Sequence, residues 1–163
     1  MKVLVLFLIT FFLSVFDVSL MPFFDFKGFY PSLLSLYFFV YSMNSEKYNI
    51  VYFSVLVGFF QDLFFFNGFG INIFLNLVMG LSLFYLSIKY NKSKYIVSVL
   101  IVVSFAVLKN IFISLYMNLF FNVNFVLIKF VYDFLYTFTL MLLLYPIFNN
   151  MFKSKLFRKG LEF

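Results

Sequence analysis

The sequence contains no cysteine, no histidine and no tryptophan, and only 11% of its residues are charged. Without cysteine the chain cannot form a disulfide or offer a thiolate nucleophile, and without histidine it has no imidazole base. The usual protein ligands of zinc and haem are missing for the same reason. We therefore expect a protein that is not an enzyme and that has no catalytic residues, metal or cofactor.

The scarcity of charge also indicates the solvent in which the chain folds. A soluble domain is about 45–50% apolar and about 25% charged. Here 65% of the residues are hydrophobic, and the mean hydropathy is +1.08. So few charged residues could not cover a surface that faces water, so the expected class is an integral membrane protein. The length of 163 residues suits one compact domain.

Apolar segments separated by polar breaks organise the chain. The segments lie near 3–21, 29–43, 49–66, 71–88, 95–120 and 123–148. A helix needs about 20 residues to cross the hydrocarbon of a membrane. The pattern therefore predicts an all-α, polytopic bundle of six transmembrane helices, in which 29–43 is the shortest segment.

The two ends of the sequence complete the expected organisation. The start, Met1-Lys2 followed by an apolar run, resembles a signal peptide, but no small-residue cleavage site follows it. We expect this segment to remain as the first helix. The predicted domains are a transmembrane domain over 1–148 and a basic cytoplasmic tail over 149–163.

The basic residues are distributed unevenly along this organisation. With six spans and both termini inside, the outer loops hold one basic residue, Lys27. The inner side holds nine: Lys2, Lys47, Lys89, Lys92, Lys94, Lys153, Lys155, Arg158 and Lys159. The positive-inside rule then predicts cytoplasmic termini. The net charge of +6 is explained by anionic lipid headgroups as partners, and not by nucleic acid.

Four charged residues lie inside the predicted helices: Asp62, Lys109, Lys129 and Asp133. An unpaired charge near the centre of the bilayer costs roughly 2.5–3.5 kcal/mol, so these side chains should face inward and find partners. Lys129 and Asp133 can pair along one helix at i, i+4. Asp62 would then be left for Lys109 or for asparagines of the fourth segment.

Polar and small residues form one stripe on each of the last four segments, as expected where helices pack in a bundle. The predicted cluster comprises Gly58, Asp62, Asn72, Asn76, Lys109, Asn110, Lys129 and Asp133. Three interpretations remain open: polar groups that hold the helices together, a wet cavity that opens outward for a ligand or a partner's segment, and a proton relay. The nearby lysines weaken the relay, which needs a lone acid.

Three stretches resemble one known family. Gly58-x-x-x-Asp62-Leu63, followed by a short break with Gly68 and Gly70 and then a polar-striped helix, is similar to the central signature of the MreD family of rod shape-determining proteins. The other two stretches resemble the opening of that family's second apolar segment and its C-terminal end: Tyr30-Pro31-Ser32-Leu33-Leu34 and Leu144-Tyr145-Pro146-Ile147-Phe148.

This resemblance implies a multi-pass protein of the bacterial plasma membrane and a scaffold of the cell-elongation machinery. The implied partner is an MreC-like protein with one membrane span, with indirect links to MreB, RodA and a class B penicillin-binding protein. The resemblance also implies a bundle similar to the substrate-binding subunits of energy-coupling-factor transporters.

Two expectations follow from these implied functions. The alternative to a scaffold is a solute-binding transport subunit of the vitamin type, with pocket side chains from Asp62, Asn76, Lys109 and Asp133. For the scaffold, we expect a seam on the second segment to receive the partner's helix, because small side chains permit close approach. The predicted seam residues are Ser32, Ser35 and Ser42.

Overall fold

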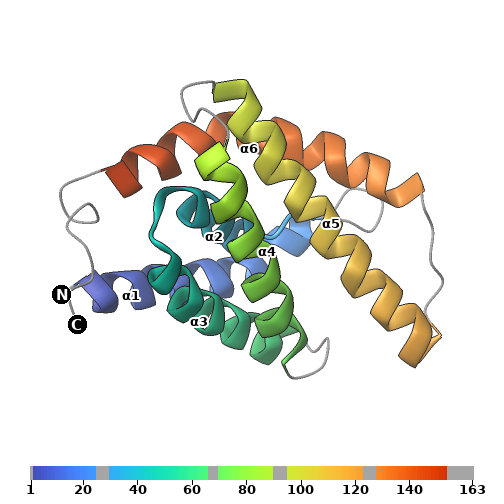
Figure 1. Ribbon diagram of the computed structural model, residues 1–163. Coiled ribbons are helices and arrows are strands. Elements are labelled where there is room, and N and C mark those ends of the chain that lie inside the picture. Colours follow the sequence, from blue (N-terminus) through green and yellow to red (C-terminus); the bar gives the residue numbers. More distant parts are fainter. Residues whose placement is uncertain (1, 25–29, 66–69, 90–94, 123–127, 154–163) are drawn as a thin grey trace.

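The computed structural model describes residues 2–24, 30–65, 70–89, 95–122 and 128–153. This part of the chain is all-helical, as predicted, and each apolar segment contributes one α-helix (Figure 1). The elements are α1 (Lys2–Ser19), a 3₁₀-helix η1 (Met21–Phe24), α2 (Leu33–Asn44), α3 (Lys47–Phe65), α4 (Ile71–Lys89), α5 (Tyr95–Phe121) and α6 (Ile128–Lys153). Several residues that the sequence singled out lie outside the described ranges: Lys27, Gly68, Lys92, Lys94, Lys155, Arg158 and Lys159.

The short helix α2 forms the centre of the bundle. Ten of its 12 residues are buried, and it packs against α1, α3, α4, α5 and α6. Figure 1 shows α2 in the middle of the other helices. Its apolar side chains are buried on every face, as expected of a helix enclosed by other helices.

Length and hydropathy together distinguish three of the described helices from the others. Three ranges in the described chain are long and apolar enough to cross a membrane: Ile71–Lys89, Tyr95–Phe121 and Lys129–Phe152. With its 12 residues, α2 spans about 18 Å at 1.5 Å per residue, which is less than the hydrocarbon thickness of about 30 Å. The prediction of six helices is therefore confirmed, whereas six complete spans remain a prediction.

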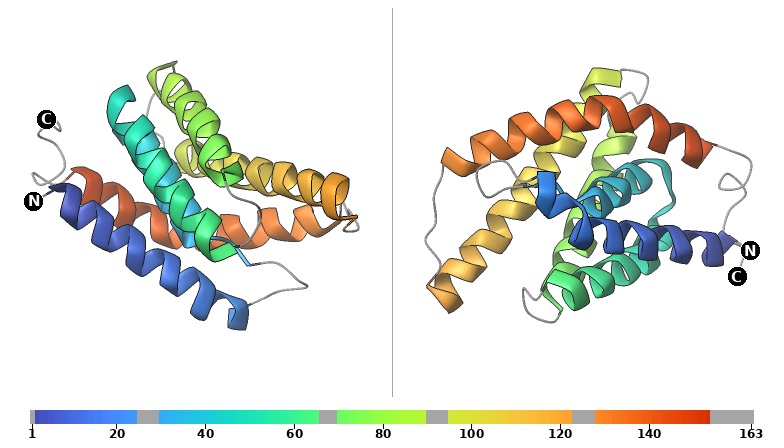
Figure 2. Two further views of the ribbon diagram at one scale, coloured as in Figure 1. Left: turned by 90° about the horizontal axis from the view of Figure 1, so that it is seen from below. Right: turned by 180° about the vertical axis from the view of Figure 1, so that it is seen from behind.

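Two helix pairs surround α2 (Figure 2). The hairpin of α3 and α4 lies on one side, with α1 along α3, and the α5–α6 pair packs on α2 as well. An aromatic cluster fills the space where α2, α3 and α6 meet. In it the ring of Tyr37 lies 5.5 Å from that of Phe148 and 4.9 Å from that of Phe152, between ring centroids.

Helix α6 contains a proline, whose missing N–H group explains one contact between α5 and α6. Pro146 has no N–H, so the carbonyl of Leu142, four residues earlier, loses its donor within the helix. The hydroxyl of Tyr95, at the start of α5, donates a hydrogen bond to that carbonyl. This side chain therefore supplies the donor that the helix itself lacks at Leu142.

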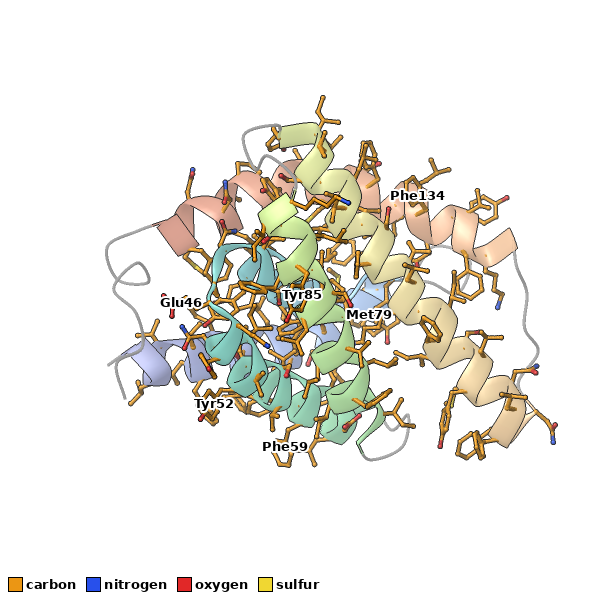
Figure 3. All side chains as sticks on the ribbon, viewed as in Figure 1. Glu46, Tyr52, Phe59, Met79, Tyr85 and Phe134 are labelled. Atoms are coloured by element: carbon orange, nitrogen blue, oxygen red, sulfur yellow. The ribbon has the colours of Figure 1, made fainter. Side chains whose placement is uncertain are left out.

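The outer faces of the helices are apolar. Tyr52 and Phe59 of α3 are 64% and 42% exposed, and both point away from the bundle in Figure 3. On other helices, Phe12 and Phe120 are each 69% exposed. An apolar exterior of this extent suits contact with lipid tails and would be unusual in a soluble monomer.

α6 passes through the predicted boundary between domain and tail. The boundary was expected at residue 148, but the helix continues to Lys153. The part of the expected tail beyond residue 153 lies outside the described residues.

Candidate functional site

Asp62 lies in the last turn of α3 and binds the start of α4. Its carboxylate accepts hydrogen bonds from Gly70 N at 2.8 Å, from Asn72 N at 3.0 Å and from Asn72 Nδ2 at 3.0 Å. The first N–H groups of a helix have no partner within the helix, and a negative charge there also interacts favourably with the helix dipole. Asp62 therefore caps α4. Of the partners expected for Asp62, an asparagine of α4 is the one that is hydrogen-bonded to it.

Gly58 lies one helical turn before Asp62, on the same face of α3. A Cβ atom placed on Gly58 would lie 2.4 Å from Ile73 Cα and 2.6 Å from Ile73 N. The backbones of α3 and α4 thus cross in direct contact, which small residues permit. The Gly-x-x-x-Asp spacing therefore places two contacts with α4 one helical turn apart on α3. Gly58 permits the close crossing of the two helices, and Asp62 caps the start of α4.

Gly58→Ala is expected to destabilise the protein by about 1–3 kcal/mol, because the added methyl group meets backbone, which cannot rotate away. Gly80→Ala on α4 is the comparison: its Cβ would meet only side-chain atoms, Phe38 Cζ at 2.7 Å and Ile50 Cγ2 at 3.0 Å, so a smaller loss is expected. Thermal unfolding in detergent measures both variants. Equal losses of melting temperature would show that the α3–α4 crossing is not the tighter constraint.

Lys109 lies at the centre of a second polar cluster and is 2% exposed. Its ammonium donates hydrogen bonds to Gln61 Oε1 at 2.5 Å, Asn76 Oδ1 at 2.8 Å and Ser35 Oγ at 3.2 Å. It also interacts electrostatically with the carboxylates of Asp62 and Asp17. One cation therefore joins α2, α3, α4 and α5.

The donor chemistry of lysine fixes the orientation of the amides around it. An ammonium group has three donors and no acceptor, so each of its partners must present an oxygen. The amide nitrogens are then free to bind neighbours: Gln61 Nε2 donates to Ser35 Oγ at 2.8 Å, and Asn76 Nδ2 donates to Gln61 Oε1 at 2.9 Å. All three N–H groups of Lys109 are used, which offsets part of the cost of burying its charge.

Asp17 is a second buried acid at the end of a helix, and it lies outside the polar cluster predicted from the sequence. Its carboxylate accepts hydrogen bonds from Ser32 Oγ at 2.8 Å, Leu33 N at 2.9 Å and Leu34 N at 3.0 Å. Asp17 caps α2 from the end of α1, as Asp62 caps α4 from the end of α3. A signal was present in the sequence, because each acid lies near the end of an apolar segment and precedes the start of the next helix.

Asp133 forms the third polar contact, between α5 and α6. Asn110 Nδ2 donates to it at 2.8 Å, and Thr137 Oγ1 donates at 3.1 Å. Asp133 is 1% exposed, so these uncharged donors satisfy a buried carboxylate. Lys129 lies half-buried in the first turn of α6, and its pairing with Asp133 stays a prediction.

Two of the three serines of the predicted partner seam lie inside the bundle, and the third is half-buried. Ser35 is 7% exposed and Ser42 is 0% exposed, and Ser42 Oγ donates to Phe38 O of its own helix at 2.9 Å. Ser32 is half-buried against Asp17 and caps α2 through a hydrogen bond from Ser35 N. The chain's own helices therefore cover Ser35 and Ser42, and a partner's helix at this seam stays a prediction.

A small cavity lies where the start of α2 meets α5 and α6. It has a volume of about 10 Å³ and is lined by Pro31, Ser32, Ser35, Leu36, Ala106, Asn110 and Thr137. None of the four pocket residues predicted for solute binding lines it: those are Asp62, Asn76, Lys109 and Asp133. Each of these four side chains is instead hydrogen-bonded to a neighbouring helix.

The fold and the site define a class of protein: a helical membrane protein whose buried polar side chains bind one another across helices. Residues 1–155 match the model of the family described as rod shape-determining protein MreD. The chain belongs to the MreD family, and the resemblance found in the sequence is confirmed. That family consists of shape-determining membrane proteins and is not known as a family of enzymes. Searches of curated proteins and of solved structures found no match.

Proposed function

We propose that this protein is a non-enzymatic scaffold of the bacterial cell-elongation complex. In this role it couples an MreC-like protein with one membrane span to MreB, RodA and a class B penicillin-binding protein, and so helps to maintain cell shape. Membership of a rod shape-determining family supports the proposal. The proposed partners follow from the family, which belongs to the MreBCD rod-shape system.

One structural observation carries the scaffold role. The buried polar groups of Asp62, Lys109 and Asp133 are hydrogen-bonded to side chains of neighbouring helices, and so they stabilise the arrangement of the bundle. A protein built in this way can act through its shape and its outer surface. Because α2 is enclosed, a partner's helix would contact an outer helix.

Within the described residues, the solute-binding alternative has less support than the scaffold. Ligand pockets usually measure about 300–1,000 Å³. The cavity beside α2 measures about 10 Å³, and the four predicted pocket residues bind protein groups instead.

Loss of this protein should make rod-shaped cells round or bulged, because the elongation machinery loses a scaffold. The experiment is depletion in the native host, followed by complementation and measurement of cell length and width by microscopy. We expect Glu46→Leu, a change at an exposed site, to restore rod shape, and Asp62→Leu to fail. Normal cell shape after depletion would remove the proposal.

We also propose six crossings of the plasma membrane with both termini in the cytoplasm, on the basis of the nine-to-one distribution of basic residues. Although α2 is short, other helices surround it, so its ends need not expose backbone to lipid.

Cysteine labelling tests this topology on a chain that has no cysteine of its own. An impermeant thiol reagent should label Gly28→Cys and Asn67→Cys from outside the cell, and should leave Lys92→Cys and Lys155→Cys unlabelled. Labelling of position 92 in intact cells would contradict the proposed orientation. Permeabilised cells, in which the inner positions become reactive, are the control.

A further inference from the structure

The cavity beside α2 lies between two of the polar clusters described above. Ser35, on one wall, belongs to the Lys109 cluster, whereas Asn110 and Thr137, on the other wall, hold Asp133. Its volume of about 10 Å³ is close to the minimum of roughly 10–15 Å³ that one water molecule needs.

The hydrogen-bond inventory of Ser35 points to a ligand in this cavity. Ser35 Oγ accepts hydrogen bonds from Lys109 Nζ and Gln61 Nε2, which use both of its lone pairs. Its own O–H must therefore donate, yet the hydrogen bonds of the described residues include no acceptor for it. Because Ser35 is 7% exposed, bulk solvent does not readily provide that acceptor.

The opposite wall offers acceptors. Asn110 binds Asp133 through its amide nitrogen, so its Oδ1 can accept a hydrogen bond. Thr137 donates its O–H to Asp133, so the lone pairs of its oxygen can accept as well. A molecule between the two walls would thus accept from Ser35 and donate to Asn110 and Thr137.

We propose that this cavity binds a single water molecule that links the Lys109 cluster to the Asp133 cluster. Three hydrogen bonds are typical of a buried water. The ammonium of Lys109, 3.2 Å from Ser35 Oγ, disfavours a cation, and the carboxylates of Asp17 and Asp133 disfavour an anion. Only a neutral ligand of one heavy atom fits both the charge and the volume.

This water joins the Lys109 cluster and the Asp133 cluster into a single hydrogen-bond network. Through it, the α5–α6 contact at Asp133 is connected to the groups that join α2, α3 and α4 around Lys109. The sequence contains a single alanine, Ala106, and it lines this cavity. A larger side chain there would occupy the space assigned to the water.

The test is a crystal or electron-microscopy structure at a resolution that shows ordered water. We expect density within hydrogen-bond distance of Ser35 Oγ, Asn110 Oδ1 and Thr137 Oγ1. Thr137→Val removes one acceptor and should weaken or abolish that density. Thr139→Val is the matched control on the exposed face of α6 and should leave it unchanged.

A second variant keeps the test independent of Asp133, which Thr137→Val also affects. Ala106→Val fills the cavity without removing a polar group and should displace the water. The proposal fails if a wild-type map that shows other buried waters has none here. It also fails if Ser35 binds Asn110 or Thr137 directly, or if the density is an ion with closer and more numerous oxygen ligands.

Discussion

Asp62→Leu should lower the free energy of unfolding by about 3–5 kcal/mol, the range for removing one partner of a buried charged pair. The variant leaves Gly70 N and Asn72 N at the start of α4 without their acceptor. It also removes a carboxylate that interacts electrostatically with the buried ammonium of Lys109. Both effects act on the same junction of α3, α4 and α5.

Thermal or denaturant unfolding in detergent measures this loss. Glu46→Leu removes an acid from an exposed site and serves as the control. Asp62→Asn separates the two effects: its amide oxygen can still accept from Asn72, but its charge is gone, so we expect an intermediate loss. Equal melting of Asp62→Leu and Glu46→Leu would show that Asp62 does not hold the bundle together.

Gln61→Leu is expected to lower the free energy of unfolding by about 1.5–3 kcal/mol, because it removes the shortest hydrogen bond of the buried ammonium of Lys109. Asn76 Nδ2 loses its acceptor at the same time, and Ser35 Oγ loses a donor. Gln61 is 2% exposed, so water cannot easily replace these partners.

A double variant distinguishes this mechanism from a simple packing defect. Gln61→Leu combined with Lys109→Met removes the charge together with its partner, and apolar replacement of a whole buried polar group is often tolerated. We expect the double variant to lose less stability than the sum of the single variants, by about 0.5–3 kcal/mol. Asn150→Leu, at an exposed position of α6, controls for the exchange of an amide for leucine. Additive losses would contradict the assignment of Gln61 as a partner of Lys109.

The interior location of the charged residues was predictable in outline. Asp62, Lys109 and Asp133 lie inside apolar segments, where exposure to lipid is costly, and the structure buries all three. Their partners could not be assigned in the same way. The sequence allows either Lys109 or the asparagines of α4 as partners of Asp62, and in the structure Asp62 accepts hydrogen bonds from Asn72 and interacts electrostatically with Lys109.

Two features depend on contacts that are distant in the sequence. The role of Asp17 as a cap is one, because its partners Leu33 and Leu34 are 16 and 17 residues away. Ser35 and Ser42 were expected on an open seam, because a short segment with small residues resembles an interface. Their burial depends on five other helices, and no pattern within α2 contains that information.

Composition and patterning along the sequence were enough to predict the membrane class, the six helices, the family and the burial of Asp62, Lys109 and Asp133. These properties follow from local quantities: hydropathy over a helix length, and the periodicity that places residues on one face. The tertiary structure alone decided that α2 is central, that Gln61 and Asp17 belong to the polar network, and which groups bind each other. Lys109 and Ser35, for example, are 74 residues apart. Such contacts depend on how whole helices pack, because each buried donor takes the acceptor that packing brings within reach.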